Sequence, residues 1–564
     1  MRPLVPPREP GSVDWQKSAT DRRRWDVLLP ALIAVLSVFV ATLLIVHTYS
    51  VFSQTFDEGE HVAAGMEWLD TGSYSYDPLN PPLARIAVAL GPYLDGARSQ
   101  GNPNVWNEAN AILEYQGHYQ RTLTLARLGI LPFFWLACFV LWRFMVRYYG
   151  RWPAALAVVF FVFCPPVLAN ASVATTDLAF TAMFFWAFLC FWNFLQAPKL
   201  SSAILAGLTI GLALLAKLSG LSYLAVAGLA LYVYALTKKQ PAPSWKYFGV
   251  ASLTLVLIIW AGYRFSVGPI LHEGQVRSVE AAELSKLPPA VAKVFFFRWV
   301  PAPEFFKGLA EAFGLSTKKR IAYLFGQTYF GGRWYFFPVA IAVKTPIPFL
   351  LLAILGAARA FVRPRLPGVA VPLIGIAGPL FVAMVSPVNL GLRHILVIYP
   401  FLAMLAALGF FWLWQVSGSR RKTLAYQGAA AILVVWSIVT CFRAAPDFIP
   451  YFNELAAPYA SSILIDSDFD WGQDLKRLSA VLQQQHVDSF WVAYEGSANL
   501  KRPSLGLPPW QPLQPNQKPS GWIAISEFNI RTRPEDFGWL GKYKPQRTVG
   551  KTIRLYHFNT APAD

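Results

Sequence analysis

The chain has 564 residues, of which 55% are hydrophobic and 14% are charged, against roughly 25% charged in an ordinary soluble domain. These values exclude a single large soluble core and indicate an integral membrane protein. The net charge of +18 would suit a nucleic-acid-binding protein, but no basic patch interleaved with aromatic residues accompanies it, so we expect no nucleic-acid partner.

The chain opens with the polar and basic segment 1–26. It is too long, ahead of the first apolar run, for a cleavable signal peptide, so we expect the first span to stay as an anchor. Apolar runs of transmembrane length then predict about 11 transmembrane helices in a mainly α-helical, polytopic protein. They lie near residues 27–47, 124–142, 152–171, 177–196, 201–217, 218–237, 246–266, 336–358, 369–386, 393–414 and 423–441.

Lys and Arg gather in alternate connections between these runs. If the amino terminus is cytoplasmic, the inner connections, such as 143–151 and 420–422, carry basic residues and no Asp or Glu. This is the positive-inside pattern. We therefore predict a multi-pass protein of the plasma membrane with a cytoplasmic amino terminus and an extracytoplasmic carboxyl terminus.

Three long segments are predicted to lie outside: about 48–123, about 267–335 and 442–564. Loops this long are usually functional. Within the first, residues 79–94 have apolar side chains at helical spacing and are expected to lie along the membrane surface. The predicted domains are thus the tail 1–26, a transmembrane domain over 27–441 and an external domain over 442–564.

The external segment has the pattern of a small α/β domain. We expect a helix over 474–486 and strands over 489–495, 521–526 and 551–558, with the Pro-rich stretch between the first two strands as loop. The sequence DSDFDWGQD, which starts at Asp466, alternates aspartates like a calcium loop. Its glycine comes one place late and its twelfth position is Arg477, so we expect a polar turn instead.

The stretch FDEGEHVAAG places three carboxylates and a histidine just after the first span. If this stretch is helical, Asp57 and His61 share a face, and Glu58 points about 100° away. The alternatives are a solvated start of a loop, or a metal site made by Asp57, His61 and a third ligand. A divalent metal therefore stays an open alternative, and we expect no other cofactor.

A second acid, Asp177, falls at the outer start of the fourth span, where Thr175 or Thr176 could cap the helix. Four cations are predicted at the same level of the bilayer, where a charge must be paired or face a cavity. Each could be an interface anchor, but together they would suit a phosphate-bearing ligand that approaches from the membrane. They are Lys217, Arg264, Lys344 and Arg393.

Residues 56–83 (FDEGEHVAAGMEWLDTGSYSYDPLNPPL) resemble the first outer loop of the polyprenyl-phosphate-sugar-dependent glycosyltransferases. This group includes the protein O-mannosyltransferases and the aminoarabinose transferase of lipid A. The order that follows is similar too, with Asn80 before Pro-Pro-Leu and a second acid in ATTD. Residues 331–346, 389–402 and 451–475 resemble bacterial members, which would place the protein in the inner membrane.

The resemblance implies a multi-span bundle capped by outer-loop helices. It also implies a polyprenyl-phosphate-linked sugar donor and a lipid, glycan or protein acceptor. By position, Asp57 matches the catalytic carboxylate, with Glu58 beside it, and Asp177 matches the second acidic site. Candidates for substrate binding are His61, Asn80, Lys217, Arg264, Tyr335, Lys344, Arg393 and His394, the last where many members have Tyr.

The chemistry agrees with these residues. Inversion at an anomeric carbon needs a base opposite the leaving group, and a carboxylate can take the proton of the acceptor hydroxyl. A polyprenyl phosphate leaves as a stable anion, so it needs cations more than an acid. Lys344 and Arg393 are the best candidates for that role.

The main alternative is a polytopic transporter of an anionic or lipid-linked substrate, because charges within a membrane can line a substrate path. Transporters usually hold such charges near the midplane and often have repeated halves. Here the acids lie at the outer boundary and no repeat is visible. A receptor or assembly protein that binds through its external domain is a further alternative, which retained activity without Asp57 would favour.

Overall fold

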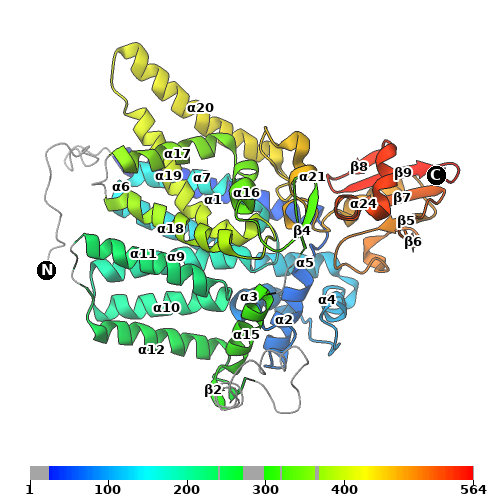
Figure 1. Ribbon diagram of the computed structural model, residues 1–564, viewed down its shortest axis with the longest axis horizontal. Helices are drawn as coiled ribbons and strands as arrows, with labels where there is room; N and C mark the ends of the chain where they lie inside the picture. The colour runs from blue at the N-terminus through cyan, green and yellow to red at the C-terminus, as the bar shows by residue number, and fades with distance from the viewer. Residues whose placement is uncertain are drawn as a thin grey trace.

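The computed structural model describes residues 24–238, 240, 242–270, 298–317, 321–362 and 367–562. Most of the predicted tail 1–26 therefore lies outside the described residues, and so does 271–297 of the second outer segment. The protein is a mainly helical, polytopic membrane protein. Its long helices lie side by side along the longest axis, and the carboxyl-terminal strands gather at one end of the bundle (Figure 1).

Each of the eleven predicted spans falls on a helix or on a pair of consecutive helices. Within the described residues, seven helical spans are long and apolar enough to cross a membrane, or nine if each of two bent pairs is one span. The seven are α1 (Arg24–Val51), α5 with α6 (Tyr119–Leu128 and Leu131–Tyr149), α9 (Asp177–Gln196), α11 (Gly220–Thr237), α12 (Trp245–Gly262), η2 with α19 (Leu392–Ile398 and Tyr399–Trp414) and α20 (Arg420–Ala444).

The bent pairs are α7 with α8 (Arg151–Val162 and Pro165–Ala171) and α16 with α17 (Phe336–Lys344 and Ile347–Val362). Their bends are 66° and 118°. Proline explains both breaks, because it lacks a backbone N–H and disfavours the helical conformation in the residue before it. The other two predicted spans are the shorter apolar helices α10 (Leu200–Ala216) and α18 (Pro367–Val385).

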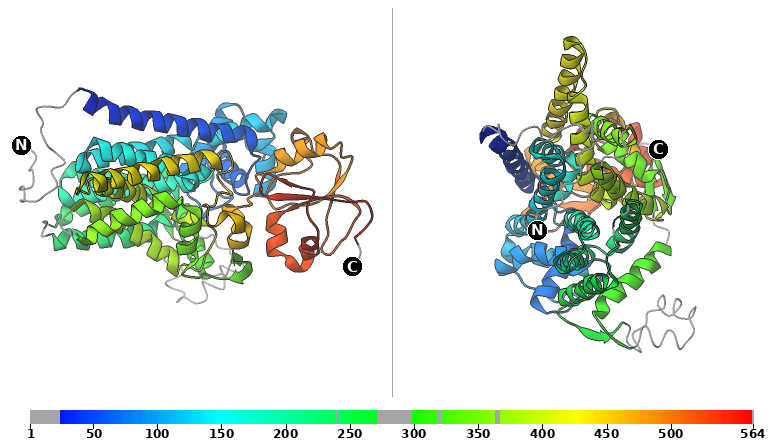
Figure 2. Two further views of the ribbon diagram at one scale, coloured as in Figure 1. Left: turned by 90° about the horizontal axis from the view of Figure 1, so that it is seen from above. Right: turned by 90° about the vertical axis from the view of Figure 1, so that its left-hand side faces the viewer.

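Burial separates the inner helices from the lipid-facing ones. In α9, 83% of the apolar window is buried inside the protein, against 6% in α12 and 22% in α20. Seen end-on, α1 and α20 lie at the edge of the bundle (Figure 2). Since a helix that is apolar all round needs either protein or lipid around it, the exposed apolar faces of α12 and α20 are surfaces for acyl chains.

The end of the bundle that carries Asp57 is covered by short helices, as the resemblance implied for such a bundle. They are α2 (Glu58–Asp70), α3 (Pro82–Leu94), α4 (Val105–Leu113) and α15 (Pro303–Thr317), with a hairpin of β3 (Ile321–Leu324) and β4 (Gln327–Phe330). Helices α2 and α3 approach closely because Gly65 has no side chain. A Cβ at this position would lie only 2.0 Å from the carbonyl oxygen of Arg85. Helix α3 buries one face and exposes Leu90 and Leu94, in keeping with a helix at the membrane surface.

The chain after α20 has two parts. Residues from Phe448 to Trp471 pack into the same hydrophobic core as the membrane helices. After them come α22 (Leu475–Gln484) and a mixed five-stranded sheet in the order β6–β5–β7–β9–β8. The strands are β5 (Phe490–Ala493), β6 (Trp510–Pro512), β7 (Gly521–Ser526), β8 (Arg547–Val549) and β9 (Ile553–Phe558).

The predicted helix and three strands of this domain are confirmed, as α22, β5, β7 and β9. The Pro-rich stretch was predicted as loop, and this is wrong at Trp510–Pro512, which forms β6. Strands β6 and β8 are the two edges of the sheet. An edge strand needs only one hydrogen-bonded side, so it tolerates proline and need not alternate apolar with polar residues.

Candidate active site

Asp57 directly precedes α2, a few residues after the carboxyl-terminal end of α1. The backbone before it is bound to a distant loop: Ser53 N–H donates to the carbonyl of Gln473 at 3.0 Å, and Phe56 N–H donates to that of Trp471 at 2.9 Å. The Asp57 carboxylate forms a hydrogen-bonded ion pair with the guanidinium of Arg393. Two segments from opposite ends of the chain therefore meet at Asp57.

Asp177 reaches the same guanidinium from another side. It is the first residue of α9, with one carboxylate oxygen 3.8 Å from Arg393 Nη1 and the other 2.5 Å from Lys217 Nζ. Neither Thr175 nor Thr176 caps the helix through its side chain, so that expectation is wrong. The helix end is stabilised instead by the charge of Asp177 itself in its first turn.

Asp57, Asp177, Lys217 and Arg393 thus form one cluster, which we call the acid–base cluster. The Asp57 side chain is 23% exposed, whereas that of Asp177 is 2% exposed. The Arg393 guanidinium lies over the ring of Trp471, 4.6 Å from its centroid. In the acid–base cluster the charges of two acids and two cations balance, and Asp57 is the acid that solvent can reach.

Glu58, the neighbour of Asp57, faces the protein interior. Its side chain is fully buried, with its two oxygens bound by Arg127 at 2.7 and 2.8 Å. The backbone N–H groups of Thr55 and Ala174 donate to it as well. Burial alone would raise the pKa of Glu58, but Arg127 and these hydrogen bonds hold it below its usual value. Such a carboxylate is poorly placed to take a proton from substrate.

His61 lies on the next turn of α2, and its backbone N–H donates to the Asp57 carbonyl at 3.2 Å. The buried imidazole accepts a hydrogen bond from Arg85 Nε at Nδ1, at 3.1 Å. Burial, helped by the charge of Arg85, lowers the pKa of His61 to about 4. The imidazole is therefore neutral at physiological pH, with Nδ1 as acceptor.

Arg85 also joins Glu60 and Asp77 to this network. Burial raises the pKa of Glu60 to about 8, with Arg85 opposing the shift and Asp77 adding to it. The Asn80 side-chain amide donates to the Asp77 carboxylate at 2.9 Å, so Asn80 shapes the turn rather than facing the cluster. Sequence reasoning noted Glu60 only as one of the three carboxylates in FDEGEHVAAG, and it missed Arg85 and Asp77, although Asp77 stands in the same motif as Asn80.

The remaining predicted cations, Lys344 and Arg264, form no ion pair with the acid–base cluster. Lys344 is buried and donates to the carbonyl oxygens of Ile449 at 2.7 Å and Asp468 at 2.5 Å. The Arg264 guanidinium lies 4.0 Å from the centroid of the Trp68 ring. It also donates to the carbonyl oxygen of Leu69, near the end of α2, at 3.5 Å. Lys344 is therefore a poor candidate for a phosphate ligand, because its ammonium is already occupied by backbone.

Of the other candidates, His394 is close enough to Asp177 to act on it electrostatically. Tyr335 precedes α16 and packs against Trp334. Among the described residues, no group of three His, Cys, Asp or Glu side chains is placed to hold a metal ion. The acid–base cluster consists instead of acids paired with cations.

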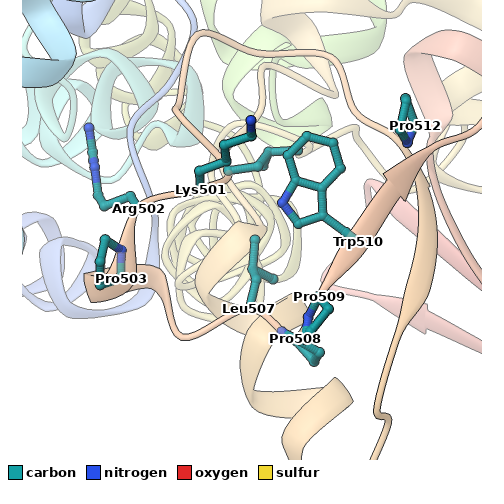
Figure 3. Close-up of a pocket in the computed structure, with 9 residues that line it drawn as sticks. Lys501, Arg502, Pro503, Leu507, Pro508, Pro509, Trp510 and Pro512 are labelled. Atoms are coloured by element: carbon teal, nitrogen blue, oxygen red, sulfur yellow. The ribbon is translucent and has the colours of Figure 1, made fainter.

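A separate pocket of about 730 Å³ lies on the carboxyl-terminal domain. Its walls come from the Pro-rich stretch and β6, with the Trp510 indole beside the Lys501 side chain and Leu507 below them (Figure 3). Arg502 turns away from it to Gln54 and Asn110. No Asp or Glu lines this pocket, so it offers no carboxylate base.

Residues 31–267 match the family model described as dolichyl-phosphate-mannose-protein mannosyltransferase. This match confirms the resemblance to the polyprenyl-phosphate-dependent glycosyltransferases, over the part of the chain that carries Asp57 and Asp177. No curated protein sequence matches the chain.

Solved structures with a similar arrangement include ArnT from Cupriavidus metallidurans bound to undecaprenyl phosphate, at 14% identity and a TM-score of 0.46 over 95% of this chain and 99% of that one. The protein O-mannosyltransferase complex of S. cerevisiae bound to its sugar donor aligns at 10% identity and a TM-score of 0.47, over 84% of this chain and 93% of that one. The Archaeoglobus fulgidus oligosaccharyltransferase aligns at 12% identity and a TM-score of 0.41, over 93% and 73%.

Proposed function

We propose that the protein transfers a glycosyl residue, with inversion, from a polyprenyl-phosphate-linked donor to an acceptor hydroxyl on the extracytoplasmic face of the membrane. The observation that supports this most directly is the meeting of Asp57, Asp177 and Arg393. Three segments far apart in the sequence bring these side chains together at one end of the bundle. The family match over residues 31–267 supports the reaction class.

In the proposed reaction Asp57 is the general base. Its carboxylate takes the proton of the acceptor hydroxyl while the acceptor oxygen forms a bond to the anomeric carbon. The bond from that carbon to the phosphate oxygen breaks, and the electron pair leaves with the polyprenyl phosphate. The partial exposure of Asp57 leaves room for an acceptor, whereas Asp177 and Glu58 are enclosed.

Arg393 has two roles in this scheme. In the free protein the Arg393 guanidinium forms an ion pair with the Asp57 carboxylate. A donor phosphate would compete with Asp57 for this guanidinium. Exchange of Asp57 for the phosphate would leave the carboxylate free to act as a base when the donor is in place, while Asp177 keeps Arg393 and Lys217 in position. Donor binding and activation of the base would thus be one event.

The experiment is a transfer assay. Envelope lipids, glycans and proteins from cells with and without the protein are first compared by mass spectrometry. The purified protein in lipid is then incubated with a polyprenyl-phosphate-linked sugar and the acceptor. A sugar-sized mass difference that the purified protein reproduces supports the proposal. Absence of any such difference, together with no release of polyprenyl phosphate in the assay, contradicts it.

A further inference from the structure

A pocket of about 710 Å³ lies where two membrane spans meet the carboxyl-terminal domain. Its walls include Ser50 of α1, Leu125 of α5 and Lys476 of α22. Ser50 lies in the last turn of the span Leu28–Val51, and α5 begins the span Tyr119–Tyr149. No member of the acid–base cluster lines this pocket. The pocket is therefore a boundary site, placed at the ends of two spans and distinct from the candidate active site.

The polar side of the pocket is basic. Among the described residues no Asp or Glu lines it, whereas three basic side chains do, namely those of His118, Arg121 and Lys476. Arg121 pairs with Asp95, just after α3, and its side chain remains 66% exposed. The Lys476 ammonium has neutral partners, because it donates to Gln120 Oε1 at 2.5 Å and to the carbonyl oxygen of Tyr49 at 3.4 Å. Its charge is therefore held in place without being neutralised.

The apolar side of the pocket continues from these cations along the membrane span. Arg121, Leu125 and Leu128 are spaced i, i+4 and i+7, so they share one face of α5. Leu125 is half-buried and Leu128 is 39% exposed. Helix α3, which contacts α5, exposes Leu90 and Leu94. One helix face thus presents a cation at the end of the span and leucines further along it.

An anionic phospholipid satisfies both sides of this pocket. Its phosphate accepts charge-assisted hydrogen bonds from ammonium and guanidinium groups, and basic pockets between membrane helices bind lipid head groups. A soluble anion would use the cations and leave the leucines uncovered. A zwitterionic lipid would bring a quaternary ammonium to a wall that carries basic side chains and, among the described residues, no acid.

We propose that this pocket binds an anionic phospholipid of the surrounding membrane. The lipid phosphate accepts hydrogen bonds from Lys476 and Arg121, and an acyl chain lies along Leu125 and Leu128. Because Lys476 belongs to α22 and the other three residues belong to α5, the bound lipid joins the carboxyl-terminal domain to a membrane span and raises the thermal midpoint. The inference goes beyond the proposed function and does not depend on glycosyl transfer.

The test measures lipid binding to the purified full chain in dodecyl maltoside, by native mass spectrometry and by the thermal midpoint. The probes are dioleoylphosphatidylglycerol, dioleoylphosphatidylcholine with the same acyl chains and a zwitterionic head, and glycerol 3-phosphate without chains. We expect phosphatidylglycerol to bind about tenfold more tightly than phosphatidylcholine and to raise the thermal midpoint, and glycerol 3-phosphate to do neither. Equal binding of the two lipids overturns the inference, and so does glycerol 3-phosphate binding as tightly as phosphatidylglycerol.

Variants then assign the binding to this pocket. Lys476→Gln and Arg121→Gln should each weaken binding of phosphatidylglycerol about tenfold, because each removes a charge-assisted hydrogen bond, whereas Lys476→Arg should keep it. The matched control, Lys542→Gln, removes an exposed lysine of the same domain outside the pocket and should bind like the wild type.

Unchanged lipid binding by a folded Lys476→Gln variant overturns the inference. If that variant does not fold, Arg121→Gln, with its exposed side chain, decides in the same way. An equal loss of binding in Lys542→Gln also overturns the inference, because it would show that the lipid responds to the net charge of the protein rather than to this pocket.

Discussion

In the acid–base cluster, each charged side chain stabilises the ionised state of its oppositely charged neighbours. Asp177 is 2% exposed and lies beside two cations, and Arg393 lies beside two carboxylates. A buried charge is costly without its partner, so each member stabilises the ionised form of the others. Single substitutions in the cluster therefore affect both chemistry and folding, and the two effects have to be measured separately.

The first prediction concerns Asp57. Asp57→Asn keeps the shape of the side chain and loses the proton acceptor, and general-base catalysis is worth roughly 10²–10⁴-fold. We expect transfer to fall by that factor while donor binding persists, and the thermal midpoint, measured alongside, reports any separate effect on folding. Asp70→Asn, at the other end of α2, is the control. Near wild-type turnover by purified Asp57→Asn would make Asp177 the next candidate for the base.

The second prediction separates two cations that the sequence could not separate. Arg393→Ala should raise the KM for the lipid donor, because it removes the guanidinium beside Asp57. Lys344→Met should instead lower the thermal midpoint and leave the donor KM of the folded fraction unchanged, since its ammonium binds the carbonyls of Ile449 and Asp468. A raised donor KM in Lys344→Met with an unchanged thermal midpoint would instead indicate that Lys344 binds the donor.

At the scale of elements, the position of α2 sets the position of Asp57. The start of α2 is attached to α5 through Glu58 and Arg127, to the turn before α9 through Ala174, and to the loop after α20 through the carbonyl of Trp471. None of these contacts involves substrate. They explain why a fully buried carboxylate stands directly beside the proposed base.

The third prediction is that Glu58→Gln and Arg127→Met are destabilising. Removing one partner of a buried ion pair typically costs about 3–5 kcal/mol. In Arg127→Met the carbonyl oxygens of Phe52 and Ser53 would also lose the guanidinium that donates to them. Thermal unfolding in detergent measures the loss, and a double variant should lose less than the sum of the single losses. Additive losses would show that the pair contributes little.

Glu58 also gives the stability a pH dependence of known sign. Its pKa is lower in the folded protein than its ordinary value of about 4.5, so the folded state binds fewer protons than the unfolded state in acid. This contribution is complete above about pH 4.5 and is lost as the pH falls through the folded pKa. The thermal midpoint of the wild type should therefore fall faster with acid than that of Glu58→Gln.

At the scale of the whole molecule, the chain returns to the membrane domain after its last span. The segment from Phe448 to Trp471 joins the main hydrophobic core, and only then does the sheet begin. The Asp466 turn and the Trp471 ring lie in this returning segment. The carboxyl-terminal region is therefore attached to the surroundings of Asp57 rather than linked by a free tether.

The fourth prediction is the orientation of the protein. The Lys and Arg bias places 143–151 and 420–422 in the cytoplasm and the chain after 442 outside. In a cysteine-free background, an impermeant maleimide should label Lys544→Cys in intact cells and Arg421→Cys only after lysis. Both positions are exposed. Labelling of position 421 in intact cells would contradict the orientation.

The sequence by itself determined the elements whose signals are local. A run of apolar residues is long enough to span a bilayer whatever its neighbours are, so all eleven predicted spans fall on helices. Short runs rich in aromatic and β-branched residues likewise predicted β5, β7 and β9. Asp57 and Asp177 could be placed at one boundary because each follows or begins a span.

Only the tertiary structure decided which charges meet. Lys217, Lys344 and Arg393 are alike in the sequence as cations near the outer boundary, yet the packing of α9, α10 and η2 brings only Lys217 and Arg393 to Asp177. The partner of an ion pair depends on the relative placement of helices, which no local pattern encodes. The same holds for the Asp466 turn, whose left-handed backbone is set by its contacts with the residues before Arg393.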